Sequence, residues 1–85
     1  MISMVNSGLF VNTTPDKMEQ VQKAIGTLKD VEINSVLNNS MLFIIVNALS
    51  MEEKKNILHE IKNIDGVASI NLAYDHFEEG KINGQ

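Results

Sequence analysis

The chain of 85 residues contains no cysteine and no arginine, and each absence narrows the range of functions. Without cysteine, disulfides, thiolate metal sites and a cysteine nucleophile are all excluded. Because every basic residue is a lysine, the chain lacks the forked donor that reads guanine edges and clamps phosphates. The formal net charge of -4 also repels a polyanion. We therefore expect no nucleic-acid partner and regard a basic peptide as a better electrostatic match.

The first fifteen residues contain no charged side chain, and the chain contains no long apolar run. The first charged residue is Asp16, so no positive region precedes an apolar segment, and residues 6–8 (Asn-Ser-Gly) interrupt the early hydrophobic residues. The longest apolar run, residues 41–46, is far shorter than the ~20 residues that cross a bilayer. We expect a cytoplasmic protein with no stable membrane insertion.

The length of the chain permits one hydrophobic core. We expect residues 1–79 to form a single domain and residues 80–85, which are rich in glycine, lysine and asparagine, to form a disordered tail.

Two segments carry helix signals. Thr14 and Pro15 are typical of a helix start, and apolar residues recur at helical spacing from there to Leu28. Ser50 begins a second helix through a capping box with Glu53. An apolar stripe follows, and Gly66 suits the left-handed residue after the helix end.

Extended segments occupy the rest of the chain. Residues 31–36 and 41–47 read as two strands, and Asn38 and Asn39 between them tolerate the positive φ angles of a tight hairpin. Further strands precede the first helix and follow the second. The predicted order is strand, helix, strand, strand, helix, strand.

An internal repeat with an offset of 36 residues supports this order. It relates Leu9 to Ile45, Thr14 to Ser50, Val21 to Ile57, Ile25 to Ile61, Leu28 to Ile64 and Val31 to Val67. Two interleaved strand-helix-strand units of this kind form an α+β, ferredoxin-like βαββαβ sandwich, in which two helices cover one face of a four-stranded antiparallel sheet. The first and third strands are central in that topology.

The sheet face that the helices leave uncovered is the expected functional surface. The third strand is apolar on both faces, so its second face must also be covered at least part of the time. If the repeat also sets the strand phase, Leu9 and Val11 lie in the core. The residues then assigned to the uncovered face are Asn6, Gly8, Phe10, Leu42, Ile44 and Val46.

The last strand is expected to place its large residues against the helices and its small residues on the uncovered face. The large set is Ile70, Leu72 and Tyr74, and the small set is Ser69, Asn71 and Ala73. This arrangement predicts an apolar floor over which a helix could pack closely. A weak homodimer that buries the same face remains an open alternative.

Acidic and imidazole side chains gather at the end of the last strand, at Asp75, His76, Glu78 and Glu79. Neighbouring residues of a strand point to opposite faces, so Asp75 and His76 do not converge easily on one ion. We expect neither a metal site nor a catalytic site here, and no cofactor. Other proteins of this fold are excluded by composition, since acylphosphatase chemistry needs arginine and copper chaperones need a cysteine pair.

The segment "IKNIDGVASINLAYDHFEE", residues 61–79, resembles the carboxy-terminal signature of the NapD family of cytoplasmic chaperones for periplasmic nitrate reductase. The matching positions are Ile64, Asp65, Gly66, Val67, Leu72, Tyr74, Asp75, His76, Glu78 and Glu79. The chain departs from the family pattern in two places, because Asp75 stands where histidine is common and residues 6–8 make the first strand more polar than usual.

The resemblance implies a chaperone, not an enzyme. Such a protein captures the twin-arginine signal peptide of the nitrate reductase catalytic-subunit precursor and delays export until the molybdenum cofactor is inserted. In this interpretation Phe10, Leu42, Ile44 and Val46 pack the apolar part of the peptide, while Gly8, Asn71 and Ala73 permit close approach. The acidic rim of Asp75, Glu78 and Glu79, beside Tyr74 and His76, attracts the arginines.

A second class of function stays open. A regulatory domain of the ACT type would use the same fold to bind an amino acid at a dimer interface. Such domains usually have glycine near the first strand-helix junction, and "NTTPD", residues 12–16, contains none.

Overall fold

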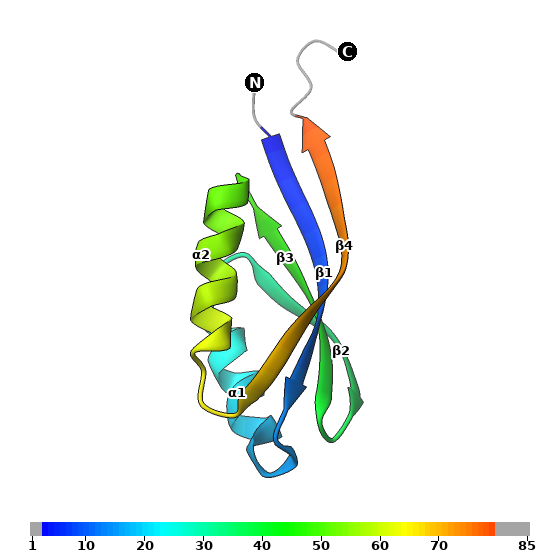
Figure 1. Cartoon of the computed structure of the whole chain (residues 1–85), viewed down its shortest axis with the longest axis vertical. Coiled ribbons are helices and arrows are strands. Elements are labelled where there is room, and N and C mark those ends of the chain that lie inside the picture. Colours follow the sequence, from blue (N-terminus) through cyan, green and yellow to red (C-terminus); the bar gives the residue numbers. More distant parts are fainter. Residues whose placement is uncertain (1–2, 80–85) are drawn as a thin grey trace.

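A computed structural model describes residues 3–79, which form an antiparallel sheet of four strands with both helices on one of its faces (Figure 1). The elements, in chain order, are β1 (Ser3–Thr13), the 3-10 turn η1 (Pro15–Lys17), α1 (Met18–Gly26), β2 (Val31–Asn38), β3 (Met41–Ala48), α2 (Met51–Lys62) and β4 (Val67–Glu79). The sheet order is β2-β3-β1-β4. The predicted ferredoxin-like α+β fold, with the first and third strands in the centre, is confirmed. The predicted tail, residues 80–85, lies outside the described residues.

The helix ends follow the sequence signals with one difference. The Ser50 hydroxyl accepts a hydrogen bond from the Glu53 backbone N–H at 3.0 Å and caps α2 as predicted. Gly66 adopts a φ of +105°, the left-handed conformation expected after α2. The side chain of Thr14, in contrast, makes no capping bond, and the proline that follows begins η1, so that α1 itself starts only at Met18.

The hairpin between β2 and β3 forms at the predicted place by a different mechanism. Neither Asn38 nor Asn39 adopts a positive φ; among the non-glycine residues described, only Asp30 does. Instead, the Asn38 side-chain carbonyl accepts a hydrogen bond from the Ser40 backbone N–H at 2.8 Å. The asparagine side chain therefore closes the turn as an Asx turn.

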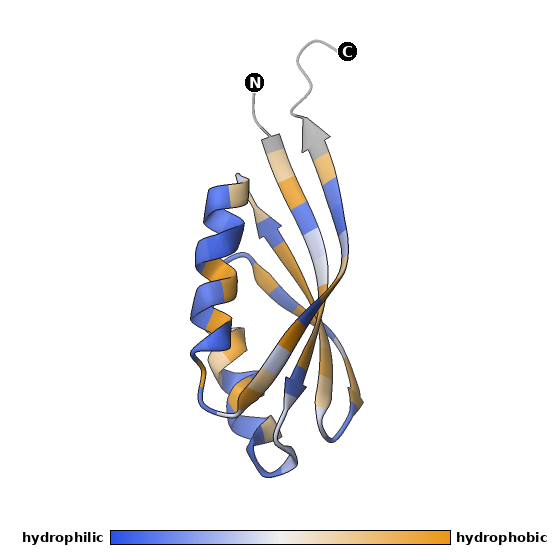
Figure 2. Cartoon of the chain, in the orientation of Figure 1, coloured by the Kyte–Doolittle hydropathy of each residue, from blue (hydrophilic) through white to orange (hydrophobic). Residues whose placement is uncertain are grey.

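The core lies between the sheet and the helices. Its fully buried members are Leu9, Val11, Val21, Ile25, Leu42, Ile44, Val46, Ala48 and Ile61, with Ile57 nearly buried. Figure 2 shows hydrophobic residues along all four strands, whereas α2 is mainly hydrophilic with a few hydrophobic positions. The helix positions that the repeat relates, Val21 with Ile57 and Ile25 with Ile61, are all members of this core.

The predicted phase of β3 was wrong by one residue. Leu42, Ile44 and Val46 face the helices and are completely buried, whereas Met41, Phe43 and Ile45 lie on the uncovered face with partial exposure. The register explains the error, because Leu9 is paired with Ile44 and not with Ile45. The segment from the strand core residue Ile44 to the helix core residue Ile57 is one residue longer than the corresponding segment from Leu9 to Val21. Strand phase therefore does not carry over from one half to the other.

The neighbouring isoleucines of β3 provide a direct test of this phase. Ile44→Ala should lower the free energy of unfolding by about 2–5 kcal/mol, since it opens a cavity in the core. Ile45→Ala removes the same atoms from a partly exposed site and should cost only about 1 kcal/mol. Urea denaturation followed by circular dichroism measures both variants. Equal losses, or a larger loss for Ile45→Ala, would contradict the assignment of the two faces.

Candidate functional site

The uncovered face of the sheet carries an aromatic and apolar cluster on its two central strands. The rings of Phe10 in β1 and Phe43 in β3 are in contact, with centroids 5.1 Å apart and planes at 43°. Met41 and Ile45 flank Phe43 on the same strand and the same face. We call these four residues the aromatic floor. No helix of the described chain covers them, because α1 and α2 both lie on the other side of the sheet (Figure 1).

A β-bulge in β4 adds a third aromatic ring to this face. The β1–β4 register runs from Leu9 opposite Leu72 to Gly8 opposite Tyr74, so Ala73 is the extra residue. The extra residue reverses the alternation, and Tyr74 joins the uncovered face while Leu72 stays on the helix side. The expectation that Tyr74 points to the helices was therefore wrong.

Gly8 is needed for the position of that ring. A Cβ atom built on Gly8 would lie 2.3 Å from Cε2 of Tyr74, much closer than any side chain allows. The tyrosine ring therefore packs directly on the backbone of β1 and still keeps 42% of its surface exposed. The space above Gly8, which was predicted to allow close approach of a bound peptide, is occupied by a side chain of this protein.

The remaining predicted site residues are spread along β4 from Asn71 to its end. Asn71 is paired with Phe10 and His76 with Asn6, which places both on the uncovered face. Ala73 is exposed in the bulge. Glu78 and Glu79 have backbone partners in Met4 and Ser3, and their side chains lie outside the described part of the structure.

Asp75 does not belong to an open acidic rim. Its carboxylate faces the helix side and accepts hydrogen bonds from the Lys54 ammonium group at 2.6 Å and from the Ser7 hydroxyl at 2.5 Å. The side chain of Lys54 is only 7% exposed, that of Asp75 21%, and Ser7 is fully buried. The hydrogen bond from Lys54, together with that from Ser7, lowers the pKa of Asp75 below its usual value. This carboxylate compensates a buried lysine and ties β4 to α2.

Polar groups border the aromatic floor at Glu32 in β2 and at Asn6 in β1, of which only Asn6 was expected on the uncovered face. Glu32 is exposed in β2 and paired with Ile45, so it lies on the uncovered face beside the floor. Asn6, which pairs with Asn47 and His76, has a buried side-chain oxygen that accepts no hydrogen bond within residues 3–79. The sequence did offer a signal for Glu32, because this residue alternates with Val31 and Ile33, which pack against the core.

Two further properties concern the described residues as a whole. None of the helices within residues 3–79 is long and apolar enough to span a membrane. In the same part of the chain, histidine, aspartate and glutamate side chains do not gather in groups of three that could hold a metal ion.

Fold and surface together define a small α+β sandwich that leaves an aromatic sheet face uncovered. The family model described as NapD protein matches residues 6–79, and the chain belongs to the NapD family. Among solved structures, the solution structure of the E. coli Tat proofreading chaperone protein NapD superposes with a TM-score of 0.77 at 17% sequence identity. The match covers 96% of this chain and 84% of that one. No match was found among curated proteins.

The pair of Lys54 and Asp75 should contribute to stability. Asp75→Asn keeps the shape of the side chain but leaves a buried ammonium group without its counter-charge, so we expect a loss of about 2–3 kcal/mol in the free energy of unfolding. Asp65→Asn is the matched control, because it breaks an ion pair with Lys17 that is largely exposed, and should change stability little. In the double variant Lys54→Met/Asp75→Asn the unpaired charge is gone, and part of the loss should be recovered. A double variant as unstable as the sum of the two single variants would show that the pair is not coupled.

The same pair predicts a dependence of stability on acid pH. Asp75 has a folded-state pKa below the ordinary value of 3.8, so its stabilisation is fully present above that value and is lost as the pH falls through the folded pKa. The difference in urea midpoint between wild type and Asp75→Asn should thus be constant near neutral pH and shrink below pH 3.8. A difference that stays constant down to full protonation would contradict the role of this carboxylate.

Proposed function

We propose that this chain is a chaperone, without enzymatic activity, that binds the twin-arginine signal peptide of a periplasmic nitrate reductase precursor in the cytoplasm. Binding would hold back export of the catalytic subunit until the molybdenum cofactor is in place. The observation that carries this proposal is the uncovered aromatic floor in a chain of the NapD family. The similar E. coli structure is that of a Tat proofreading chaperone, which supports the same function.

The aromatic floor fits the apolar part of such a peptide. Phe10, Met41, Phe43 and Ile45 form a continuous, partly exposed surface on the two central strands. A helix or an extended segment laid across it would bury these side chains and gain about 25 cal/mol for each Å² of apolar surface removed from water. This surface replaces the floor of Leu42, Ile44 and Val46, which is buried beneath the helices.

The borders of the floor fit the paired arginines. Tyr74 offers the face of an exposed ring, over which a guanidinium group can stack with a gain of about 0.5–2 kcal/mol. Glu32 supplies an exposed carboxylate on the opposite side of the floor. Glu78 and Glu79 remain proposed partners of the arginines, whereas Asp75 acts indirectly by fixing β4 to α2.

A titration with defined ligands tests the proposal. The isotopically labelled protein would be titrated with the signal peptide of the nitrate reductase precursor from the same genome, with a twin-lysine version of that peptide, and with free amino acids. We expect resonance changes at Phe10, Phe43, Ile45 and Tyr74 with the native peptide. Binding of the twin-lysine version should be weaker, because lysine stacks and pairs less well than arginine. Changes only with amino acids would favour the ACT-type function instead.

A charge placed on the floor should abolish much of the binding without unfolding the protein. Ile45→Lys puts an ammonium group on a partly exposed site where an apolar, basic peptide has to dock, and should weaken binding by several kcal/mol. Leu49→Lys is the matched control, since Leu49 is 57% exposed and lies outside the strands of the sheet. Calorimetric titration with the signal peptide measures both variants, and thermal unfolding confirms that they fold. Equal affinity of Ile45→Lys and wild type would exclude the floor as the binding surface.

A further inference from the structure

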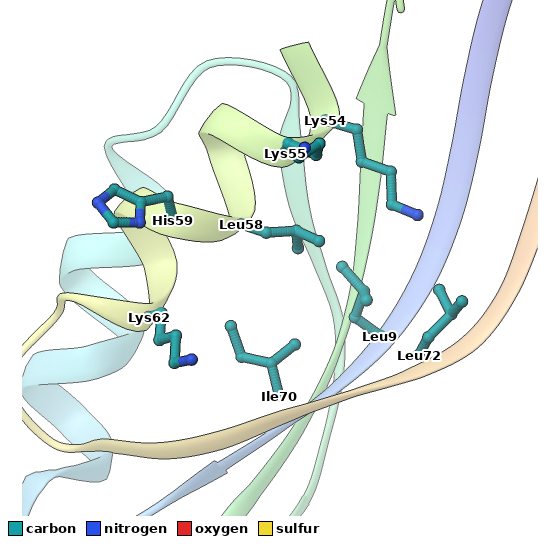
Figure 3. Close-up of a pocket in the computed structure, with 8 residues that line it drawn as sticks. All are labelled: Leu9, Lys54, Lys55, Leu58, His59, Lys62, Ile70 and Leu72. Atoms are coloured by element: carbon teal, nitrogen blue, oxygen red, sulfur yellow. The ribbon is translucent and has the colours of Figure 1, made fainter. Parts of the chain in front are cut away.

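A groove lies on the other side of the sheet, between α2 and β4, away from the aromatic floor. Its volume is about 410 Å³. Four apolar side chains and four nitrogen-bearing side chains line it: Leu9, Leu58, Ile70, Leu72, Lys54, Lys55, His59 and Lys62. Figure 3 shows Leu58 directed from α2 into the space opposite Leu9, Ile70 and Leu72, whereas His59 points away from them. The groove thus combines an apolar base with a basic border.

The charges of α2 are segregated around the helix axis. Lys54, Lys55 and Lys62 line the groove towards β4. Glu53 and Glu60 line a separate depression on the side of α1, together with residues 27–30. No carboxylate is among the eight residues that line the groove. In a chain of net charge -4, three of the seven lysines therefore meet at one apolar depression.

Two of these three lysines can pair with the carboxylates of a ligand. Lys54 is compensated by Asp75, as described above. Lys55 and Lys62 are exposed and form no ion pair within residues 3–79. The apolar base is also incompletely covered, since Leu72 remains 55% exposed. A partner that fits must supply apolar side chains and carboxylates together.

We propose that this groove is a second docking site, which binds an acidic, leucine-bearing segment of a protein partner. The leucine side chains of that segment pack on Leu58, Ile70 and Leu72, and its carboxylates pair with Lys55 and Lys62. The site has the opposite charge preference from the aromatic floor, which is proposed for a basic peptide. Because the two surfaces lie on opposite faces of the sheet, both can be occupied at once. The proposal stands independently of the signal-peptide function.

Two synthetic peptides test the site. The acidic probe is acetyl-ELEELLEE-amide, and its control, acetyl-KLKKLLKK-amide, has the same leucines with reversed charge. With methyl-labelled protein, the acidic probe should shift the methyl resonances of Leu58, Ile70 and Leu72 and leave that of Ile45 unchanged. The basic control should not shift the groove methyls. Shifts confined to the aromatic floor, or no shifts with the acidic probe, would overturn the proposal.

Charge-reversed and apolar variants locate the contacts. Lys55→Glu/Lys62→Glu should weaken binding of the acidic probe on the order of tenfold, as expected for two exposed ion pairs that become repulsive. Lys23→Glu/Lys29→Glu has the same net charge and should bind like wild type, because neither lysine lines the groove. Leu72→Ser should weaken binding severalfold, whereas Leu37→Ser, at an exposed position of the β2 edge strand, should not. Equal effects of the two charge-reversed variants would indicate only a general attraction and overturn the site.

Two other occupants give different results in the same experiments. Shifts of the groove methyls that depend on protein concentration, without any peptide, would place a second copy of the chain in the groove. Saturation of the same methyls by dodecanoate, with no effect of the acidic probe, would assign the groove to a small amphipathic carboxylate. Either result would overturn the assignment to a protein segment.

Discussion

One extra residue in β4, Ala73, determines which face of the sheet each side chain of β4 beyond Leu72 reaches. The bulge lies between Leu72, which stays on the helix side opposite Leu9, and Tyr74, which crosses to the uncovered face opposite Gly8. Without it, Tyr74 would point into the helix layer, and Asp75 would face solvent on the opposite side from Lys54. The third aromatic ring of the uncovered face and the ion pair that ties β4 to α2 therefore depend on the same local irregularity. Gly8 permits it, since any larger residue would displace the tyrosine ring.

The ion pair of Lys54 and Asp75 connects the two candidate surfaces. Lys54 reaches from α2 past the groove to Asp75, so its buried charge is compensated at one end of the groove. The residue that precedes Asp75 in the chain is Tyr74, which lies on the opposite face of the sheet, with the aromatic floor. A buried pair is rarely a large net gain in stability compared with apolar residues, but the loss of one partner is costly. The pair of Lys54 and Asp75 fixes the carboxy-terminal half of β4 to α2. This matters because β4 is an edge strand and pairs only with β1 in the described sheet.

The two sides of the sheet consequently differ in chemistry. The uncovered side presents Phe10, Phe43 and Tyr74 with a carboxylate at Glu32, a combination suited to apolar and cationic ligands. The helix side presents leucines with Lys55 and Lys62, a combination suited to apolar and anionic ligands. The two proposed surfaces together would allow one domain to hold a basic peptide and an acidic segment of a protein at the same time. The acidic net charge of the whole chain gives no indication of the basic groove. Acidic and basic residues are interspersed along the sequence and are sorted onto different surfaces only by the fold.

Local signals in the sequence determined the elements, the fold class and the family resemblance. The capping residues of α2, Gly66 after it and the helical spacing of Val21, Ile25, Ile57 and Ile61 act over a few neighbouring residues, so they can be read without the tertiary structure. Only the tertiary structure decided the strand faces. β3 is apolar on both sides, so its alternation carries no direction, and its phase follows from the pairing of Leu9 with Ile44. The bulge at Ala73 then reversed the faces of β4 beyond Leu72, because register is set by partners distant in sequence and one inserted residue inverts every position after it.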